Sequence, residues 1–400
     1  MSAVLLPPAE HLSPELLEIL GARCAAGRHG LVLDLDALER RYAAAVAAAA
    51  PHDVRLLCAV KASTIRDVLA LAARHGLGFD VANARELAAA RAAAPDAAVS
   101  LTSPALGIEE RPALYAAFVR GEIRRWHADS LAQLDELVRA CPAGSAVGVR
   151  VSLDGLEIPE GMPLYRPSRF GIRLSELPAA REIADAHGCS VRWLHAHNGS
   201  EENDTASYVF AAEQIVAAAA ASGLALEALD LGGGLVLDAT VAQLSAFFGA
   251  VRAAAGPDVE LTFEPGRFWM TDTMALVTRV LDVKPAARCA WLVLDLGLMS
   301  HLQWAYDLRY PVLGPIGTGA DGEPLRWQPV GRSCFEEDML DDDEVVPVAA
   351  GAPIPAAGDW IVLGNITGYT IELACDFNGI DRPTHEIVRS GQRVLARVEG

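Results

Sequence analysis

Short apolar segments recur through the first two thirds of the chain, and stretches rich in alanine, leucine, glutamate and arginine lie between them. The segments have the length and composition of buried strands. The intervening stretches, for example 65–75, 84–94 and 208–221, have the composition of helices. Eight segments are expected to form strands: 56–62, 78–82, 99–103, 124–128, 147–153, 191–198, 228–232 and 261–265.

The alternation of strand and helix, repeated eight times, predicts an α/β protein built on a (β/α)8 barrel. An open, doubly wound sheet has the same alternation, so the pattern alone leaves that arrangement open. After about residue 270 the alanine-rich stretches give way to runs such as 291–296 and 360–363, which favour strands. We therefore expect a second, β-rich domain in the last third of the chain.

Lys61 ends the apolar run 56–60, so a buried strand would carry one amine at its C-terminal tip. An ammonium held against apolar groups loses hydration, which favours the neutral, nucleophilic amine that a Schiff-base lysine needs. A solvated lysine in the loop after an ordinary strand is the alternative interpretation. For Lys61 taken alone, the solvated lysine is the preferred interpretation.

Glycines follow the seventh and eighth expected strands, in 230–234 and 264–267. In (β/α)8 barrels, functional groups collect at the C-terminal ends of the strands, and phosphate commonly binds after strands seven and eight. Glycine lets backbone N–H groups approach an anion, and Arg267 can add a bidentate contact. Glycine triplets also form simple turns, but their position facing Lys61 predicts a phosphate site.

The sixth expected strand ends in two histidines, His195 and His197, followed by Ser200. Alternation places both rings on one face, where a ring can stack on a flat cofactor while Ser200 donates to its phosphate. A two-histidine metal site competes with this interpretation. No third ligand with a familiar spacing accompanies the pair, so we predict no metal and interpret His195 as a core residue.

These residues belong to a longer ordered set that resembles the pyridoxal-phosphate-dependent amino-acid decarboxylases of the alanine-racemase fold type, the group of ornithine, diaminopimelate and carboxynorspermidine decarboxylases. The matching stretches follow the family's order over nearly the whole chain. They are 59–62, 78–82, 168–172, 197–200, 231–234, 264–267, 334–338, 368–369 and 377–379. The resemblance implies a barrel over residues 30–270 and a β-rich domain formed by residues 1–29 and 271–400.

The resemblance also implies the roles of the cofactor-site residues. Lys61 would form the Schiff base with pyridoxal 5'-phosphate (PLP), and His197 would stack on the pyridine ring. The phosphate would be held by Ser200, Gly233, Gly234, Gly266, Arg267 and Tyr369. Glu264 would face the pyridine nitrogen and keep it protonated, so that the ring can accept electrons. Racemases of this fold place an arginine there, so Glu264 favours decarboxylation over racemisation. A charge at a helix N-terminus is the other interpretation of Glu264, and the Pro-Gly-Arg that follows makes it the less favoured one.

The same family takes the proton for the α-carbon from a cysteine of the second subunit. Cys334 occupies that motif, so the resemblance implies a homodimer with shared active sites. A buried, inert thiol is the usual interpretation of a single cysteine. The motif position favours the catalytic role.

Substrate selection is expected to involve the residues around Cys334. Family members that act on diamino acids commonly carry Asp or Glu after the cysteine, where this chain has Phe335. Asp307 matches a family position that receives a distal ammonium, and Asp338 matches the acidic residue four positions after the cysteine. Arg332 replaces a usual proline and could meet a carboxylate or form a structural ion pair. We expect an amino acid with a polar, amine-bearing side chain, either a diamino acid or a modified or conjugated one.

Two other functions are compatible with the same set of motifs. One is an amino-acid racemase or epimerase, which usually needs a tyrosine as a second base. The other is a catalytically silent homologue that binds partners, although such proteins tend to lose cofactor-site residues that this chain keeps.

Composition restricts the partners and the compartment. A net charge of −19 excludes a nucleic-acid-binding face. The first ten residues lack the features of a signal peptide, and no apolar run is long enough for a membrane helix. Seven cysteines without metal or C-x-x-C spacing predict free thiols in a reducing compartment, the cytoplasm.

Overall fold

The computed structural model of the protein describes residues 4–5, 12, 14–162, 168–197, 199, 204–235, 239–286, 289–303, 326–340, 355–390 and 392–394. The chain divides into two compact units. One is Arg41–Phe268, and the other combines Met1–Arg40 with Trp269–Gly400. The first change of unit falls within helix α2 (Leu35–Ala49), about ten residues after the expected boundary at residue 30.

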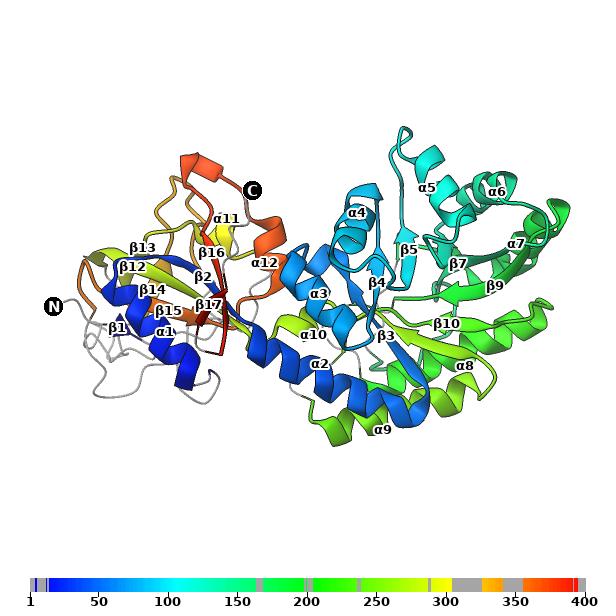
Figure 1. Ribbon diagram of the computed structural model, residues 1–400, viewed down its shortest axis with the longest axis horizontal. Coiled ribbons are helices and arrows are strands. Elements are labelled where there is room, and N and C mark those ends of the chain that lie inside the picture. The colour runs from blue at the N-terminus through cyan, green and yellow to red at the C-terminus, as the bar shows by residue number, and fades with distance from the viewer. Residues whose placement is uncertain are drawn as a thin grey trace. The chain divides into compact units, whose positions relative to one another are not determined.

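The first unit is a closed parallel barrel (Figure 1). Its strands follow one another around the sheet in the order β6-β5-β4-β3-β11-β10-β9-β7, and the pairing of β6 with β7 closes it. This closure excludes the open, doubly wound sheet. The eight expected strands are all present: β3 (Val54–Ala59), β4 (Gly78–Val81), β5 (Val99–Ser103), β6 (Arg125–Ala128), β7 (Ala146–Ser152), β9 (Ser190–His195), β10 (Ala228–Asp230) and β11 (Glu260–Phe263). A short strand, β8 (Ile172–Arg173), adds to β7.

Helices alternate with these strands and lie outside the barrel in Figure 1. They are α3 (Arg66–Arg74), α4 (Ala84–Ala93), α5 (Arg111–Val119), α6 (Leu131–Ala140), α7 (Leu177–Ala186), α8 (Thr205–Ala221) and α9 (Val241–Ala255), and α10 (Arg267–Met270) follows the last strand. Several begin at side chains that accept a backbone N–H of the first turn. Asn83, Ser130, Asp204 and Thr240 cap α4, α6, α8 and α9 in this way.

Aromatic side chains join the barrel wall to its helices. Phe263 on β11 is fully buried, and its ring centroid lies 5.4 Å from that of Phe247 and 5.3 Å from that of Phe248 on α9. Truncation of a buried ring of this size to alanine typically costs about 3–5 kcal/mol. This packing fixes the strand that ends just before Glu264.

The second unit is built on a mixed eight-stranded sheet. The main path runs β1-β15-β12-β2-β16-β17, with β13 paired to β12 and β14 paired to β13. Strand β2 comes from the N-terminal segment and lies inside the sheet, antiparallel to β12 and parallel to β16. The strands are β1 (Val4–Leu5), β2 (Gly30–Asp34), β12 (Met274–Pro285), β13 (Cys289–Leu294), β14 (Arg326–Val330), β15 (Trp360–Gly364), β16 (His385–Arg389) and β17 (Gln392–Val394).

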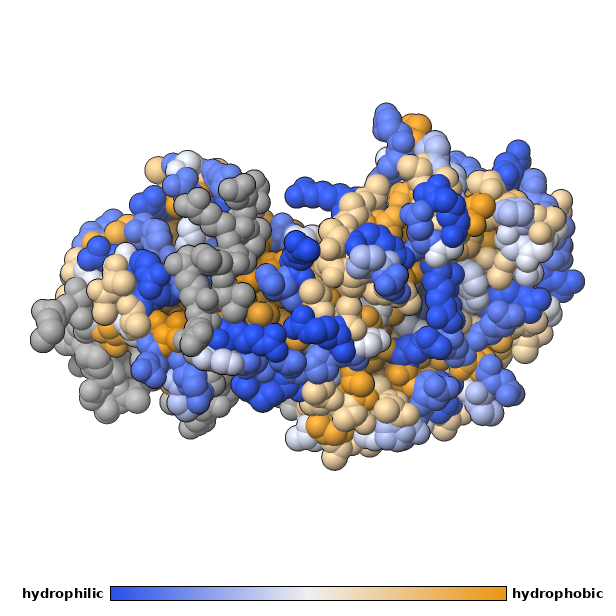
Figure 2. Space-filling model, in the orientation of Figure 1, coloured by the Kyte–Doolittle hydropathy of each residue, from blue (hydrophilic) through white to orange (hydrophobic). Residues whose placement is uncertain are grey.

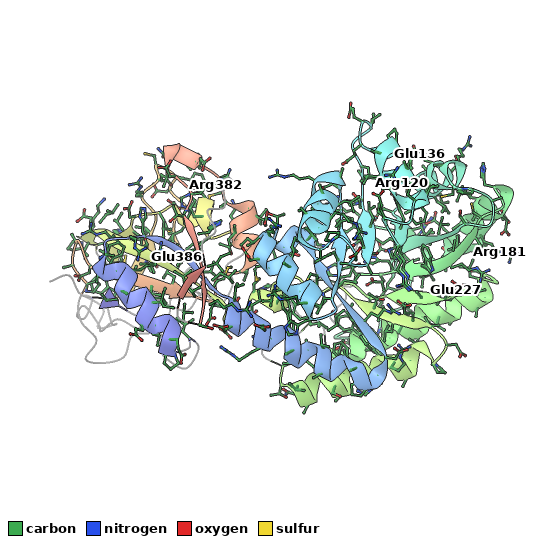
Figure 3. The ribbon with its side chains drawn as sticks, in the orientation of Figure 1. Arg120, Glu136, Arg181, Glu227, Arg382 and Glu386 are labelled. Atoms are coloured by element: carbon green, nitrogen blue, oxygen red, sulfur yellow. The ribbon has the colours of Figure 1, made fainter. Side chains whose placement is uncertain are left out.

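In the described part of this unit, the sheet is accompanied by α1 (Pro14–Ala25), α11 (Leu298–His301) and α12 (Gly368–Leu373). Leu16 and Leu20 of α1 pack into a core with Val32 of β2 and Val362 of β15. Arg23 of the same helix forms a buried ion pair with Glu386 of β16, which is labelled in Figure 3. Helix α1 is therefore attached to the sheet by both apolar and ionic contacts.

Charged side chains cover much of the barrel unit's visible face, with apolar residues between them (Figure 2). Arg120, Glu136, Arg181 and Glu227 lie on its outside in Figure 3, and each forms an exposed ion pair. Such pairs contribute about 0–1 kcal/mol each. No helix in the described part of the chain has both the length and the apolar composition needed to cross a bilayer. The seven cysteines are all free thiols.

Candidate active site

Strand order in the barrel brings separated parts of the sequence together at one end. Neighbouring strands β4, β3, β11, β10 and β9 run parallel, so their C-terminal ends lie side by side. Asp80, Lys61, Glu264, Asp230 and His195 lie at or just after these ends, in that order around the barrel. The expected grouping of Lys61 with the two glycine loops is therefore present.

Lys61 lies in the short turn Val60–Ala62 directly after β3. Its Nζ is 3.5 Å from Oδ2 of Asp80, and the lysine side chain is about half exposed while the aspartate is buried. The apolar run before Lys61 predicts an apolar environment for this amine, and the structure places the carboxyl group of Asp80 beside it. Asp80 was not selected from the sequence, although it lies in a stretch that matched the family.

Glu264 and His195 form a buried pair. His195 Nε2 lies 3.2 Å from Glu264 Oε2, and both side chains are almost fully buried. Burial by itself would raise the pKa of Glu264, but the facing His195 and the nearby Lys61 hold that pKa well below its usual range. Glu264 is therefore a carboxylate, and His195 has a more specific place than the core role we first gave it.

Two further acids stand beside Glu264. Burial and the negative charge of Glu264 raise the pKa of Asp80 and of Asp230 well above the usual range for an aspartate. The protonated forms of these two acids are thus favoured, while Glu264 carries the negative charge. Asp230 is the first residue of the glycine-rich stretch 230–234, but in the sequence only its position at the end of an expected strand indicates a place in the site.

His197 packs against the glycine loop after β10. The backbone N–H of Gly233 donates to His197 Nδ1 at 3.1 Å. A Cβ added at Gly232 would lie 2.5 Å from the same nitrogen, and one at Gly233 would lie 2.8 Å from the carbonyl oxygen of Glu264. Burial and the charge of Lys61 lower the pKa of His197 to about 3. A neutral imidazole therefore lies against the loop, and the glycines are needed for this close approach.

The residues present fit a pyridine ring with an aldehyde and a phosphate. Apart from the facing carboxyls of Asp80 and Asp230, Oε1 of Glu264 has no hydrogen-bond partner among the described residues, and it is buried. A protonated ring nitrogen would give this oxygen a charged donor. Lys61 supplies an amine for an aldehyde, and the loop that contains Gly233 and Gly234 is of the glycine-rich kind whose backbone N–H groups can bind an anion.

The same cluster has the elements of a metal site. His195, Asp230 and Glu264 each offer one ligand atom, and these atoms lie within 4.8 Å of one another. No third ligand has a familiar metal-site spacing from the histidine pair in the sequence. In the structure, the carboxyl groups of Asp230 and Glu264 lie beside His195. Because His195 Nε2 already lies at hydrogen-bond distance from Glu264, we do not propose a metal role for this group.

The other predicted residues for the phosphate, the proton transfer and the distal amine fall in several segments. Ser200 and Asp307 are outside the described residues. Gly266 directly precedes α10, which begins at Arg267. Tyr369 lies in α12 of the β-rich unit, and Cys334 lies in the loop after β14 of that unit.

Several side chains of the loop that carries Cys334 form contacts within the β-rich unit. Arg332 Nη1 is 2.8 Å from Asp295, so the structural ion pair considered for Arg332 is formed. Asp338 is buried and accepts backbone N–H groups from Met299 and Ser333. Phe335 is 38% exposed. Together with Cys334, Phe335 lines a hollow of about 430 Å³ on this unit.

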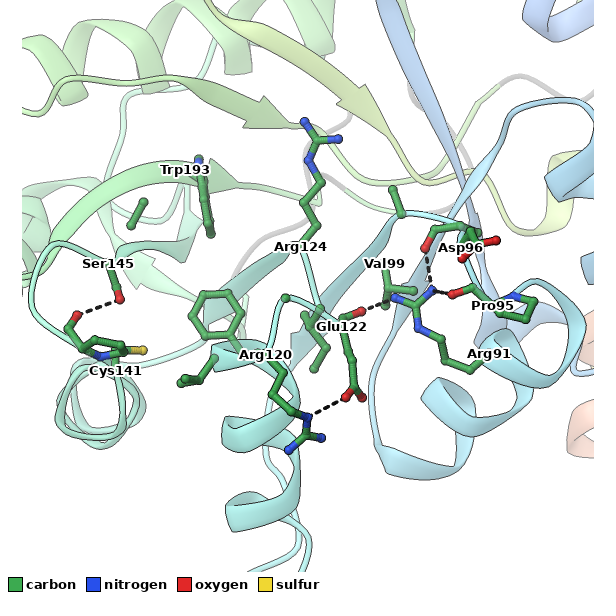
Figure 4. A pocket seen from close by; sticks show the side chains of 18 residues that line it. Arg91, Pro95, Asp96, Val99, Arg120, Glu122, Arg124, Cys141, Ser145 and Trp193 are labelled. Carbon is green, nitrogen blue, oxygen red and sulfur yellow. Dashed lines mark hydrogen bonds and ion pairs between the residues drawn. The ribbon is translucent and has the colours of Figure 1, made fainter.

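A larger hollow of about 930 Å³ opens near the N-terminal ends of the barrel strands, where Figure 4 shows Arg91, Glu122, Arg124 and Trp193 among its lining. Arg91 donates to the carbonyl oxygens of Pro95 and Ala97. Arg120 at the rim pairs with Glu122. These polar groups are thus engaged within the protein, at the end of the barrel away from Lys61.

Comparison with known proteins identifies the family. Residues 35–271 match the model of the pyridoxal-dependent decarboxylase family for its pyridoxal binding domain. The chain belongs to the pyridoxal-dependent decarboxylases. The resemblance seen in the sequence is therefore confirmed, and the cofactor of this decarboxylase is PLP. The protein is a PLP-dependent amino-acid decarboxylase.

Relatives of this decarboxylase are similar over most of their length. The chain is 27% identical to a diaminopimelate decarboxylase of Neisseria meningitidis over 86% of this chain and 85% of that protein. It is also 27% identical to the lysine/ornithine decarboxylase of Selenomonas ruminantium over 80% of each protein. A crystal structure of lysine decarboxylase from Selenomonas ruminantium superposes with a TM-score of 0.72 at 25% identity, covering 94% of this chain and 96% of that one.

Proposed function

We propose that this decarboxylase acts at the carboxyl ends of the barrel strands, with Lys61 attaching the cofactor and Glu264 facing its ring nitrogen. The observation that supports this best is the buried pair of Glu264 and His195, in which Oε1 of Glu264 can accept from a protonated nitrogen. When bound there, PLP supplies a cationic ring that withdraws electrons from the bond that breaks. Glu264 keeps the ring nitrogen protonated.

The remaining cofactor contacts follow from the loops. His197 would stack on the ring, because its neutral imidazole lies against the glycine loop that approaches the phosphate. Gly234 and Gly266 would offer backbone N–H groups, and the N–H of Gly233 would do so on exchanging its present acceptor, His197 Nδ1, for the phosphate. Arg267, Ser200 and Tyr369 would add side-chain donors. Asp80 would hold the amine of Lys61 whenever that amine is released from the cofactor.

Cys334 would give its thiol proton to the α-carbon after CO2 leaves, and a proton from solvent would restore the thiol. Cys334 is exposed, as a group that works at another protomer's site must be. We therefore propose a homodimer with shared active sites. The nearby exposed rings of Phe335 and Phe377 offer apolar surface for such a contact.

For the substrate we propose a diamino acid or a modified, amine-bearing amino acid, as the names of the diaminopimelate and lysine/ornithine decarboxylases suggest. Asp307 would receive the distal amine. Phe335 carries no charge for it, and Asp338 and Arg332 already have partners in their own unit. A substrate whose distal end also has apolar surface would match this loop better than ornithine.

A panel of diamino acids and conjugates of them, tested with PLP-loaded protein, measures CO2 release directly. We expect CO2 from at least one compound and none from Lys61→Ala. Borohydride reduction followed by mass spectrometry should find the cofactor on the Lys61 peptide. Exchange of the α-proton without loss of CO2 would instead identify a racemase, and an unmodified Lys61 in PLP-saturated protein would refute the proposal.

A further inference from the structure

A side chain from a distant segment holds the backbone of Cys334. The backbone N–H of Cys334 donates to Oδ1 of Asn378 at 2.7 Å. Asn378 lies in the short turn Phe377–Gly379, which matched the family in sequence but received no role. Cys334 itself is exposed, so this bond is a specific restraint on an otherwise accessible loop.

The turn that carries Asn378 has a fixed and unusual backbone. Asn378 has φ 60° and ψ 19°, in the left-handed region that asparagine tolerates better than most residues. The flanking backbone is also bonded. The N–H of Cys375 donates to the carbonyl of Ser300 at 3.0 Å, and that of Ile380 donates to the carbonyl of Phe377 at 3.2 Å. The carboxamide of Asn378 is thus presented from an anchored turn.

Restraints on the two sides of the cysteine come from different residues. Asp338 accepts the N–H of Ser333, directly before Cys334, at 3.1 Å. The N–H of Phe335, directly after it, donates to Ser333 Oγ at 3.3 Å. Only the bond to Asn378 acts on the peptide of the cysteine itself among the hydrogen bonds of the described residues. Loss of that bond should therefore move the thiol more than it moves the rest of the loop.

We propose that Asn378 is a positioning residue for Cys334, because its carboxamide oxygen fixes the cysteine peptide and thereby sets where the thiol stands. The inference rests on the proposed role of Cys334 as proton donor. Proton transfer to carbon depends on the approach of the donor, and a displacement of about 1 Å is enough to slow it strongly. An exposed loop needs such a restraint to deliver its proton to one atom.

Three variants of the full-length, PLP-loaded protein test this. Asn378→Gly removes the acceptor and keeps the positive φ without strain, and Asn378→Asp keeps an acceptor at the same place. Ser390→Gly is the control. Ser390 has φ 50° in the same unit, and among the described residues its backbone N–H donates to Asp36 and not to the Cys334 loop. The readout is the rate of iodoacetamide alkylation at Cys334 relative to Cys375, the other exposed cysteine, measured by peptide mass spectrometry.

We expect the rate ratio to rise about two- to tenfold in Asn378→Gly, the effect of losing one hydrogen bond, and to stay at the wild-type value in the other two variants. Turnover should fall in Asn378→Gly with KM and the cofactor absorbance unchanged, and Asn378→Asp should restore it. A wild-type ratio in Asn378→Gly, or an equal change in Asn378→Asp, would overturn the inference. If wild type releases no CO2 from any substrate, the proposed function fails, while the alkylation ratio still decides the positioning role.

Discussion

Glu264 keeps its negative charge in a buried place because His195 lies against one of its oxygens. A buried carboxylate without a donor takes up a proton, and a neutral Glu264 would stabilise a protonated ring nitrogen poorly. Under the proposed function, the electronic effect of the cofactor depends on a residue that is not expected to touch the cofactor. His195 shows how a histidine on an interior strand position can serve a site without lining it.

Replacing His195 by phenylalanine should weaken PLP binding by about ten- to a hundredfold, the range of one hydrogen bond to a charged group. His195→Gln keeps a donor of similar reach and should lose much less. Titration of the cofactor-free protein with PLP, followed by absorbance, measures both affinities. Equal affinity of the phenylalanine variant and wild type would contradict the role given to His195.

His127 makes the free energy of unfolding depend on pH. It is buried on β6 beside Thr102, and burial, with His195 adding to it, lowers its pKa well below the usual value. The unfolded chain binds a proton at this histidine near pH 6.5 and the folded protein does not. The stability contribution is therefore present above that pH and is lost as pH falls.

Relative to His127→Gln, wild type should lose about 1.4 kcal/mol of unfolding free energy for each pH unit below about 6.5. Urea unfolding of the cofactor-free proteins at pH 7.5, 6.5 and 5.5 gives the difference directly. A constant difference between the two proteins over this range would show that His127 is protonated in the folded state.

At the scale of elements, the barrel could be predicted and part of the β-rich unit could not. The barrel strands are largely buried, so they are visible as short apolar or β-rich runs wherever they lie. Strand β2 is an apolar run of the same kind, and nothing in its composition indicates that it pairs with β12 and β16 rather than with β3. The resemblance implied a barrel that begins at residue 30, whereas the compact unit begins at Arg41.

Part of the candidate site could be predicted from the sequence and part could not. Lys61, His197 and Glu264 stand in ordered motifs that the sequence displays. Asp80 and Asp230 become visible only when strand order is known, because β4 and β10 flank the strands that lead to Lys61 and Glu264. Sequence spacing does not contain that adjacency.

Helix α1 contains a glycine whose replacement should be favourable. Gly21 lies within Pro14–Ala25, its φ is not positive, and an added Cβ meets no atom within 4 Å. Gly21→Ala should raise the unfolding free energy by about 0.5–1 kcal/mol, because alanine loses less backbone freedom on helix formation. Urea unfolding followed by circular dichroism tests this, and a lower midpoint would mean that the helix end depends on the glycine.

At the scale of the whole molecule, the proposed homodimer with shared active sites makes a quantitative prediction. Lys61→Ala and Cys334→Ala should each be strongly impaired alone. Dissociated and reassociated together in equal amounts, half of the dimers are mixed and each mixed dimer has one intact site, so activity should recover to about a quarter of wild type. Native mass spectrometry confirms that mixed dimers form. Mixed dimers without recovered activity would exclude a site built from Lys61 of one protomer and Cys334 of the other.

The interior place of β2 in its sheet has a consequence for biosynthesis. A ribosome releases Gly30–Asp34 long before it makes β12 and β16, the strands on either side of it. Arg41–Phe268 can meanwhile complete its closed barrel, while the apolar early segment waits with both of its edges unsatisfied. We therefore expect chaperones to bind longest to nascent chains that have not yet reached His385, the first residue of β16.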